Sequence, residues 1–153
     1  MDKNRQRNRV MKRRKMSKER KNMHSLPAYK AAYELFKECR FRFRTVSKNC
    51  KGIAHDVLEK LLDVMVDIEL VYWQVENKKR LAETYRTVLK VIIIIRSMHD
   101  AGELSTQHYS VISQYSAELS KHMGNWNKTY NKNTMIEETE ETEEGDRQNA
   151  VDS

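Results

Sequence analysis

The stretch VLKVIIIIR, residues 88–96, is the most apolar part of an otherwise polar chain and decides the fold class. Since a membrane-crossing helix needs about 20 apolar residues, the stretch is too short to span a bilayer. Its β-branched residues would also suit a strand, but no Gly or Pro interrupts residues 78–100, and apolar side chains recur there at helical spacing. The residues that share this face are Leu81, Tyr85, Val88, Leu89, Ile92, Ile95 and His99. We therefore predict a buried helix with neighbours on more than one side, within the fold or in an oligomer.

Composition agrees with an all-α protein. The chain has 153 residues with only 4 Gly and 1 Pro, which leaves little material for the tight turns of sheets. Cys39 and Cys50 do not form a disulfide framework, and a reducing cytoplasm fits them better. The N-terminus lacks the apolar region of a secretory signal, so we expect a cytoplasmic protein without a membrane partner.

Charge is distributed very unevenly along the chain. Residues 1–24 carry eleven Lys or Arg and two acidic residues, a net charge of +9. Residues 134–153 carry eight Asp or Glu and one Arg, a net charge of −7. Both tails lack the apolar content of a core, so we expect them to be disordered on either side of a folded domain at residues 25–133. The basic arm is either a solubilising segment or an RNA-binding one, and its KRRK run also weakly resembles a nuclear localisation patch. The acidic tail is either simply solvated or competes with RNA for the arm.

Capping signals and periodicity divide residues 25–133 into predicted helices. The first begins at Pro27 with Ser25 as a cap, and the second spans about 53–76. The third, residues 78–100, starts after a possible Asn77 cap and ends at Gly102, and the next starts after Ser105. Their expected inward faces contain Tyr29, Tyr33, Phe36, Phe43 and Val46, then Ala54, Val57, Leu58, Leu61, Leu62, Met65, Ile68 and Tyr72, and finally Tyr109, Ile112, Ser116, Leu119, Met123, Trp126 and Tyr130.

No catalytic or metal-binding constellation is present in the sequence. His55, Glu59, Asp63 and Asp67 are spaced along one helical strip, but no second Glu-x-x-His helix completes a metal site, and a solvated acidic face explains the strip better. There is no Gly-rich phosphate loop and no nucleophile in a recognisable motif. His99 and His108 are better explained as helix-end residues. We therefore expect a protein that is not an enzyme and needs no cofactor.

Basic residues supply the candidate binding surface. The run RFRFR, residues 40–44, is either a solvent-exposed arginine face with Phe41 and Phe43 turned inward or a phosphate-contacting patch. Cations on the third helix either keep an apolar helix soluble or meet a polyanion that offsets their mutual repulsion. The candidates are Lys37, Arg40, Arg42, Arg44, Lys48 and Lys51 near the first turn, and Lys78, Lys79, Arg80, Arg86, Lys90 and Arg96 on the third helix.

Three segments resemble a known family. They are LPAYKAAYEL (residues 26–35), RSMHDAGELS (96–105) and LSKHMGNWNK (119–128). Together they resemble the four-helix-bundle accessory variability determinants of diversity-generating retroelements and, more distantly, proteins encoded in intervening sequences of large-subunit ribosomal RNA. The resemblance covers about residues 26–128 and neither tail.

The resemblance implies an up-down four-helix protomer in a homopentameric barrel with a basic surface. It also implies binding to the retroelement's reverse transcriptase and template RNA, or an RNA/cDNA hybrid, in support of mutagenic retrohoming. The family's usual aromatic-Pro-basic-Glu-aromatic-basic stretch is replaced here by VSKNCK, residues 46–51, which keeps both basic positions but neither the Pro nor the aromatics. The alternatives are a structural bundle that binds only proteins and a ribosome-associated protein.

Overall fold

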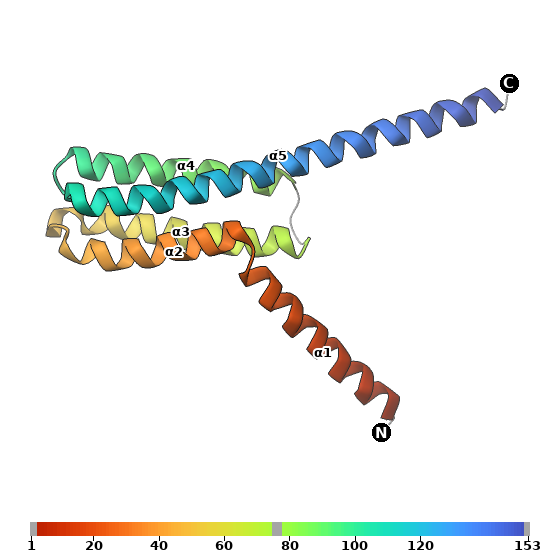
Figure 1. Ribbon diagram of the computed structural model, residues 1–153, viewed down its shortest axis with the longest axis horizontal. Helices are drawn as coiled ribbons and strands as arrows, with labels where there is room; N and C mark the ends of the chain where they lie inside the picture. The colour runs from red at the N-terminus through yellow and green to blue at the C-terminus, as the bar shows by residue number, and fades with distance from the viewer. Residues whose placement is uncertain (1–2, 75–77, 152–153) are drawn as a thin grey trace.

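The computed structural model describes the backbone of residues 3–74 and 78–151, and the side-chain surroundings of residues 6–15, 22–74 and 79–129. Every regular element in these backbone ranges is a helix, which confirms the all-α prediction (Figure 1). The elements are α1 (Lys3–His24), α2 (Pro27–Arg42), the short 3₁₀ helices η1 (Phe43–Thr45) and η2 (Lys48–Cys50), α3 (Lys51–Tyr72), α4 (Lys78–Asp100) and α5 (Thr106–Val151).

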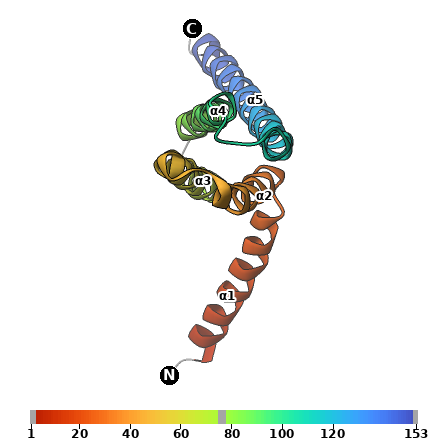
Figure 2. The same cartoon turned by 90° about the vertical axis from the view of Figure 1, so that its left-hand side faces the viewer.

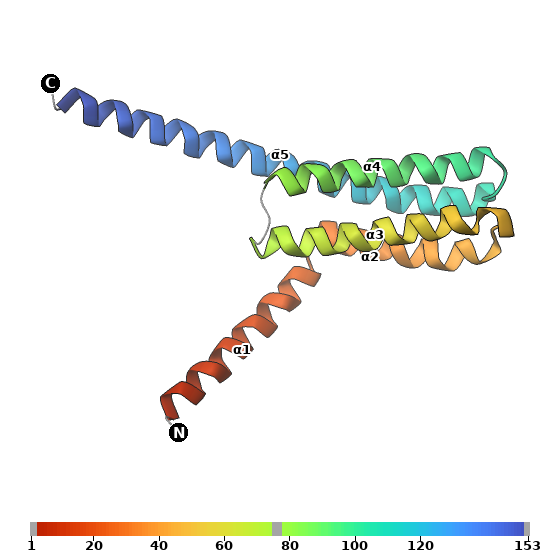
Figure 3. The ribbon, with the colours of Figure 1, turned by 180° about the vertical axis from the view of Figure 1, so that it is seen from behind.

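Helices α2, α3, α4 and the first half of α5 form a helical bundle. Each of them packs against two of the others, in the pairs α2–α3, α3–α4, α4–α5 and α2–α5. Viewed along the bundle, α5 lies over α2 and α4 lies over α3 (Figure 2). Successive helices run in opposite directions, so the α2–α3 turn and the α4–α5 turn lie at one end of the bundle (Figures 1 and 3). Both chain termini extend from the other end.

The first predicted helix begins where Pro27 indicated. Pro27 occupies the first turn of α2, where its missing N–H removes no helical hydrogen bond. The predicted Ser25 cap is wrong, because Leu26 precedes α2 without a side-chain cap. The Ser25 hydroxyl instead donates to the carbonyl oxygen of Asn22, 2.7 Å away at the end of α1.

The bounds of the second predicted helix differ from the prediction, whereas those of the third agree with it. The second predicted helix starts two residues early, at Lys51, because η2 leads directly into α3. It ends at Tyr72, followed by Gln74 at φ 58°, rather than at residue 76. The predicted Asn77 cap and residue 76 itself lie outside the described residues. The prediction of a helix over residues 78–100 is confirmed by α4.

The α4–α5 turn follows its predicted chemistry. Gly102 has φ 75°, and its N–H donates to the carbonyl of His99 at 2.9 Å. The N–H of Glu103 donates to the carbonyl of Met98 at 2.9 Å, which completes the helix-ending motif that favours glycine. The Ser105 hydroxyl accepts the N–H of His108 at 3.2 Å, so Ser105 caps α5 as predicted. His99 has a helix-end role, because its ring stacks on Tyr109 with centroids 4.2 Å apart.

The stretch VLKVIIIIR is only partly buried. Val88, Val91 and Ile95 lie in the core, whereas Ile93 is 67% exposed and Leu89 is 40% exposed. The prediction of neighbours on more than one side is confirmed within the chain, because α4 packs against both α3 and α5. The outer side of α4 faces solvent, because a helix at the corner of a bundle has only these two neighbours.

The predicted inward faces are correct in outline, with one systematic error on α2. The residues buried on α2 itself are mostly small, and none is aromatic: Ala28, Ala31, Ala32, Leu35 and Cys39. Tyr33, which we placed inward, is 47% exposed, while Phe43 and Val46 are buried as predicted. Small residues allow close packing of helix backbones, and the larger aromatics are displaced to the rim. On α3, Leu62 is likewise exposed. On α5, Ile112, Ser116, Leu119 and Met123 are buried as predicted, and Tyr130 lies outside the described side chains.

Both tails are helical, which differs from the expected disorder. Residues 3–24 form α1, and α5 continues through the expected domain boundary at residue 133 to Val151. Residues 3–24 contain no Pro or Gly, and both segments are rich in Lys, Arg, Gln or Glu, which have high helix propensity. Low hydrophobicity therefore identified segments without a core of their own but did not exclude helix. No helix in the described part of the chain is long and apolar enough to cross a membrane.

Candidate nucleic-acid interface

The outward face of α2 carries a continuous row of cations and aromatic rings. Its members recur every three or four residues, so they share one side of the helix. We call this the α2 stripe; it consists of Lys30, Tyr33, Lys37, Arg40 and Phe41 on α2 and of Arg44 in η1, which follows α2 directly, all of them exposed. The opposite side of α2 is the alanine-rich side that packs into the core, and burial of that side is what holds the stripe toward solvent.

Acidic residues on α2 are paired within the helix. The Lys37 ammonium lies 3.0 Å from the Glu34 carboxylate, and the Arg42 guanidinium lies 2.9 Å from that of Glu38. The hydrogen bond from Lys37 to Glu34 raises the pKa of Lys37. Arg42 is half-buried by its pair, so it contributes less to the outward surface than its neighbours.

Two exposed rings lie beside cations of the stripe. The Lys37 Nζ is 5.2 Å from the centroid of the Tyr33 ring, and the Arg44 guanidinium is 5.5 Å from that of Phe41. Phe41 is 60% exposed, so the alternative in which both rings of the RFRFR run turn inward does not hold. Only the other ring of the RFRFR run, Phe43, is buried. An exposed ring next to a cation presents both a stacking surface and a positive charge to the same ligand.

The turn after α2 extends the positive surface. Phe43, Val46 and Cys50 are buried, and they fix η1 and η2 against the end of the bundle. Lys48 and Lys51 are consequently held outward. Among the residues whose side chains are described, neither lysine has an acidic partner, and Arg40 on α2 has none either. The VSKNCK segment thus contains the 3₁₀ helix η2, which is anchored by the buried Cys50.

The candidates on α4 lie on a different side of the bundle from the α2 stripe. Helix α4 lies diagonally across the bundle from α2 (Figure 2), and its first turn lies at the end opposite the α2–α3 turn and its Lys48 and Lys51 (Figure 1). Arg80 lies 3.8 Å from the Glu83 carboxylate. Arg86 and Lys90 are exposed along the helix, while Arg96 reaches the α2–α3 end and lies 3.9 Å from Asp100. The structure therefore divides the predicted residues into two groups rather than one surface.

A pocket adjoins the other end of the stripe. Its volume is about 420 Å³, and it is lined by His24, Tyr29, Lys30 and Tyr33 where α1 joins α2. The rings of His24 and Tyr29 are stacked with centroids 5.2 Å apart. Burial raises the pKa of the Tyr29 phenol, with a smaller contribution from the charge of Glu69. This phenol is therefore a neutral hydrogen-bonding group at physiological pH.

Sequence reasoning missed three members of this surface: Lys30, Tyr33 and Phe41. A regular signal was available, because these residues and the predicted cations share one helical period. The separation of the α4 candidates was also foreseeable, since adjacent antiparallel helices place the start of the third helix far from the first turn.

The remaining reactive side chains do not assemble into a site in the described part of the chain. No group of three or more His, Cys, Asp or Glu is placed to hold a metal ion among the described residues, and His55 lies 3.9 Å from Glu59 alone. The thiols of Cys39 and Cys50 are free and buried. Burial raises the pKa of Cys39 to about 12 and also raises that of Cys50, so both are poor nucleophiles.

Comparisons with family models, with curated proteins and with solved structures found no match for this chain.

Proposed function

We propose that this protein is a non-catalytic RNA-binding protein that serves as the accessory component of a diversity-generating retroelement. In this role it binds the template RNA and the reverse transcriptase during mutagenic cDNA synthesis. The proposal rests on one observation above the others: the α2 stripe continues into Lys48 and Lys51, and the cations Arg40, Lys48 and Lys51 have no acidic partner among the described side chains. The retroelement assignment is supported by the three resembling segments of the sequence.

The charges of this surface suit a polyanion. Each phosphate that a Lys or Arg neutralises releases condensed counterions, which supplies sequence-independent affinity that weakens as salt rises. The aromatic members suit RNA with unpaired bases. Bases stack on exposed rings at about 1–3 kcal/mol each, and duplexed bases are not available for such stacking. We therefore expect loops or single-stranded segments to be preferred over continuous duplex.

Fluorescence anisotropy with a labelled hairpin RNA tests the proposal. The variant Arg40→Gln/Lys48→Gln/Lys51→Gln should bind more weakly, and the slope of log K against log salt should flatten by about 2, since each single-strand phosphate contact contributes roughly 0.7. The matched control Lys79→Gln/Arg86→Gln/Lys90→Gln removes the same charge from α4. Equal losses of RNA affinity in both variants would show that binding depends on net charge rather than on this surface. Unaltered binding by the first variant would refute the interface. Substitution of Arg40, Arg42 and Arg44 by Ala provides a second test of the stripe.

The proposal includes a homopentameric assembly of up-down four-helix protomers. Its support lies in apolar side chains on outer faces of the bundle: Leu89 and Ile93 on α4, and Leu62 and Val66 on α3 are all more than a third exposed. Exposed apolar patches commonly mark protein contacts. Light scattering should give a mass near five protomers, and a monomer at micromolar concentration would contradict this part of the proposal.

The same apolar residues favour a second candidate function, a structural bundle whose partners are only proteins. Under this alternative the cations of the α2 stripe serve solubility, and RNA affinity would be weak at physiological salt. Affinity for the hairpin RNA at physiological salt separates the two. Tight binding that is lost in the Arg40→Gln/Lys48→Gln/Lys51→Gln variant would favour the first proposal, and weak binding by the unaltered protein would favour protein contact alone.

A further inference from the structure

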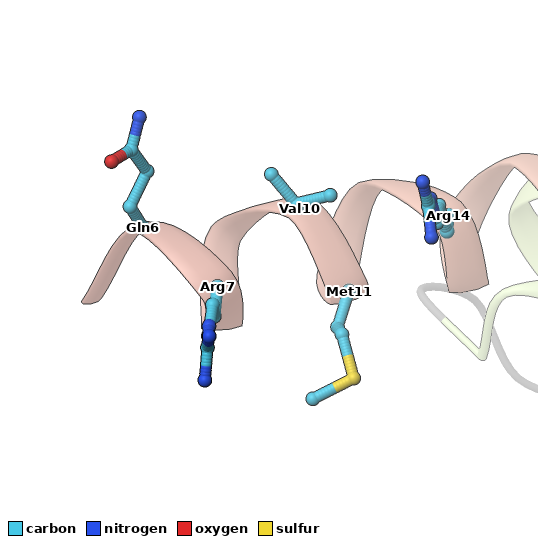
Figure 4. Close-up of a pocket in the computed structure, with 5 residues that line it drawn as sticks. All are labelled: Gln6, Arg7, Val10, Met11 and Arg14. Carbon is cyan, nitrogen blue, oxygen red and sulfur yellow. The ribbon is translucent and has the colours of Figure 1, made fainter. Parts of the chain in front are cut away.

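Helix α1 carries two exposed apolar side chains between arginines, and neither is packed against the bundle. Val10 is 45% exposed and Met11 is 66% exposed. Arg7 and Arg14 lie one turn before and one turn after this pair, and Gln6 lies beside them (Figure 4). Arg7 and Met11 point to one side of the helix, whereas Gln6 and Val10 point to the other, so each side carries one exposed apolar side chain. Exposed apolar side chains flanked by cations suit a helix that carries apolar residues beside acidic ones.

The chain itself contains a segment of that chemistry. Beyond the bundle, α5 continues without interruption to Val151. This continuation contains the apolar pair Met135 and Ile136, followed by six glutamates between Glu137 and Glu144. Its charge is opposite to that of α1, where residues 7–15 alone contain six Lys or Arg. The length of the segment also fits, because residues 135–146 occupy about 18 Å of helix against about 33 Å for α1.

Within one chain the two helices do not meet. They leave the same end of the bundle but diverge from each other (Figures 1 and 2). The bend between α1 and α2 is held by the fully buried Met23, by the stacking of His24 on Tyr29, and by the hydrogen bond from Ser25 to Asn22. To bring α1 alongside its own α5 would disrupt these contacts. A second copy of the chain can reach α1 without disturbing them.

We propose that α1 is a docking surface for the acidic continuation of α5 from a second copy of this chain. Val10 and Met11 contact Met135 and Ile136 of that copy, while Arg7, Arg14 and their basic neighbours pair with the glutamates. This contact is separate from the bundle-to-bundle packing proposed above and does not depend on RNA binding. It also shields the arm, because a polyanion and the acidic helix compete for the same cations.

Energy transfer between separately labelled full-length chains tests this contact. One chain carries a donor at Asn8→Cys and the other an acceptor at Thr139→Cys. The native thiols are buried, so labels attach selectively to the introduced cysteines. Transfer should occur after mixing at about 0.05 M salt and fall at least about fivefold at about 1 M salt, where charges are screened beyond roughly 3 Å. An acceptor at the exposed Gln107→Cys, at the far end of α5, is the matched control.

Charge reversal supplies the decisive comparison. Arg7→Glu/Arg14→Glu on the donor chain should abolish transfer, and Glu137→Arg/Glu141→Arg on the acceptor chain should restore it. The reversed arginines are exposed, so circular dichroism should show an unchanged bundle. Equal transfer to the Gln107 acceptor, or no restoration, would overturn the proposal. Transfer confined to doubly labelled single chains in an excess of unlabelled protein would also overturn it, in favour of an intrachain contact.

Discussion

The phenolic oxygen of Tyr85 on α4 lies 3.5 Å from the position that a Cβ on Gly124 of α5 would occupy. This is an ordinary van der Waals distance, so α5 tolerates a methyl group there. The group that approaches Gly124 is a side chain rather than the backbone of α4.

Gly124→Ala should stabilise the protein. Glycine inside a helix costs about 0.5–1 kcal/mol relative to alanine, and the added methyl meets no clash. Gly102→Ala should act in the opposite direction by about 1 kcal/mol, because φ 75° is strained for alanine although space is available. Urea unfolding of both variants measures the effects. Shifts of the same sign would contradict the assignment of one glycine to helix interior and the other to helix end.

Thr84→Val should destabilise the packing of α3 against α4 by about 1 kcal/mol, the usual net contribution of one hydrogen bond. Thr84 is 1% exposed. Its hydroxyl lies 3.1 Å from the Asp67 carboxylate and 2.7 Å from the Arg80 carbonyl oxygen. Valine has the same shape without the hydroxyl. Thr84→Ser retains the hydroxyl and is the matched control, so unfolding curves in which serine is tolerated no better than valine would argue against the hydrogen bond.

Substitution of the isoleucines at residues 92–95 should affect stability very differently at buried and at exposed positions. Ile95→Ala should cost about 2–5 kcal/mol because the side chain is 1% exposed and its removal leaves a cavity. Ile93→Ala should change the free energy of unfolding of the monomer by less than about 0.5 kcal/mol because the side chain is 67% exposed. If Ile93 contributes to the proposed pentamer, its substitution should lower the assembled mass in light scattering while leaving monomer unfolding unchanged.

Alkaline pH should weaken the fold through Cys39. Burial raises the pKa of its thiol from the ordinary 9.0 to about 12, so the unfolded chain releases this proton before the folded one does. The contribution to stability is complete below about pH 9 and is lost between about pH 9 and 12, at up to about 1.4 kcal/mol per pH unit. Cys39→Ala should show a correspondingly shallower decline across this window. If the free energy of unfolding declines equally with pH in both proteins, a group other than Cys39 causes the alkaline sensitivity.

Phe41→Leu should reduce affinity for RNA with unpaired bases by about 1–3 kcal/mol without altering the salt dependence, because stacking releases no counterions. Arg40→Gln should flatten the salt dependence instead. Anisotropy titrations with a single-stranded RNA and a matched duplex measure both effects. A Phe41→Leu loss that is equal for duplex and single strand would exclude stacking on this ring.

Local signals in the sequence predicted the helix ends better than the faces. Pro27, Gly102 and Ser105 act through backbone geometry that depends on a few neighbouring residues, so their roles could be predicted. The face of α2 was misplaced because periodicity alone does not distinguish an alanine ridge that packs closely from an aromatic ridge at the rim. Tyr33 and Phe41 are exposed because α5 and α3 contact the small side of α2.

The grouping of the cations required the tertiary arrangement. Arg40 and Arg86 both belong to basic stretches, and nothing local to either stretch reports that they occupy different parts of the bundle. The partners of a cation are also decided by the fold. Lys37 and Arg42 are paired along the helix, whereas Lys48 and Lys51 are held away from acidic groups by the burial of Val46 and Cys50.

The continuity of α5 sets the distance between molecules that its tail joins. No loop separates Met123, buried in the core, from the acidic residues near position 140. The intervening helix is about 25 Å long and does not shorten without breaking its own hydrogen bonds. If a second copy binds this segment as proposed above, the helix holds it about 25 Å from Met123, so that contact does not bring the two bundle cores together.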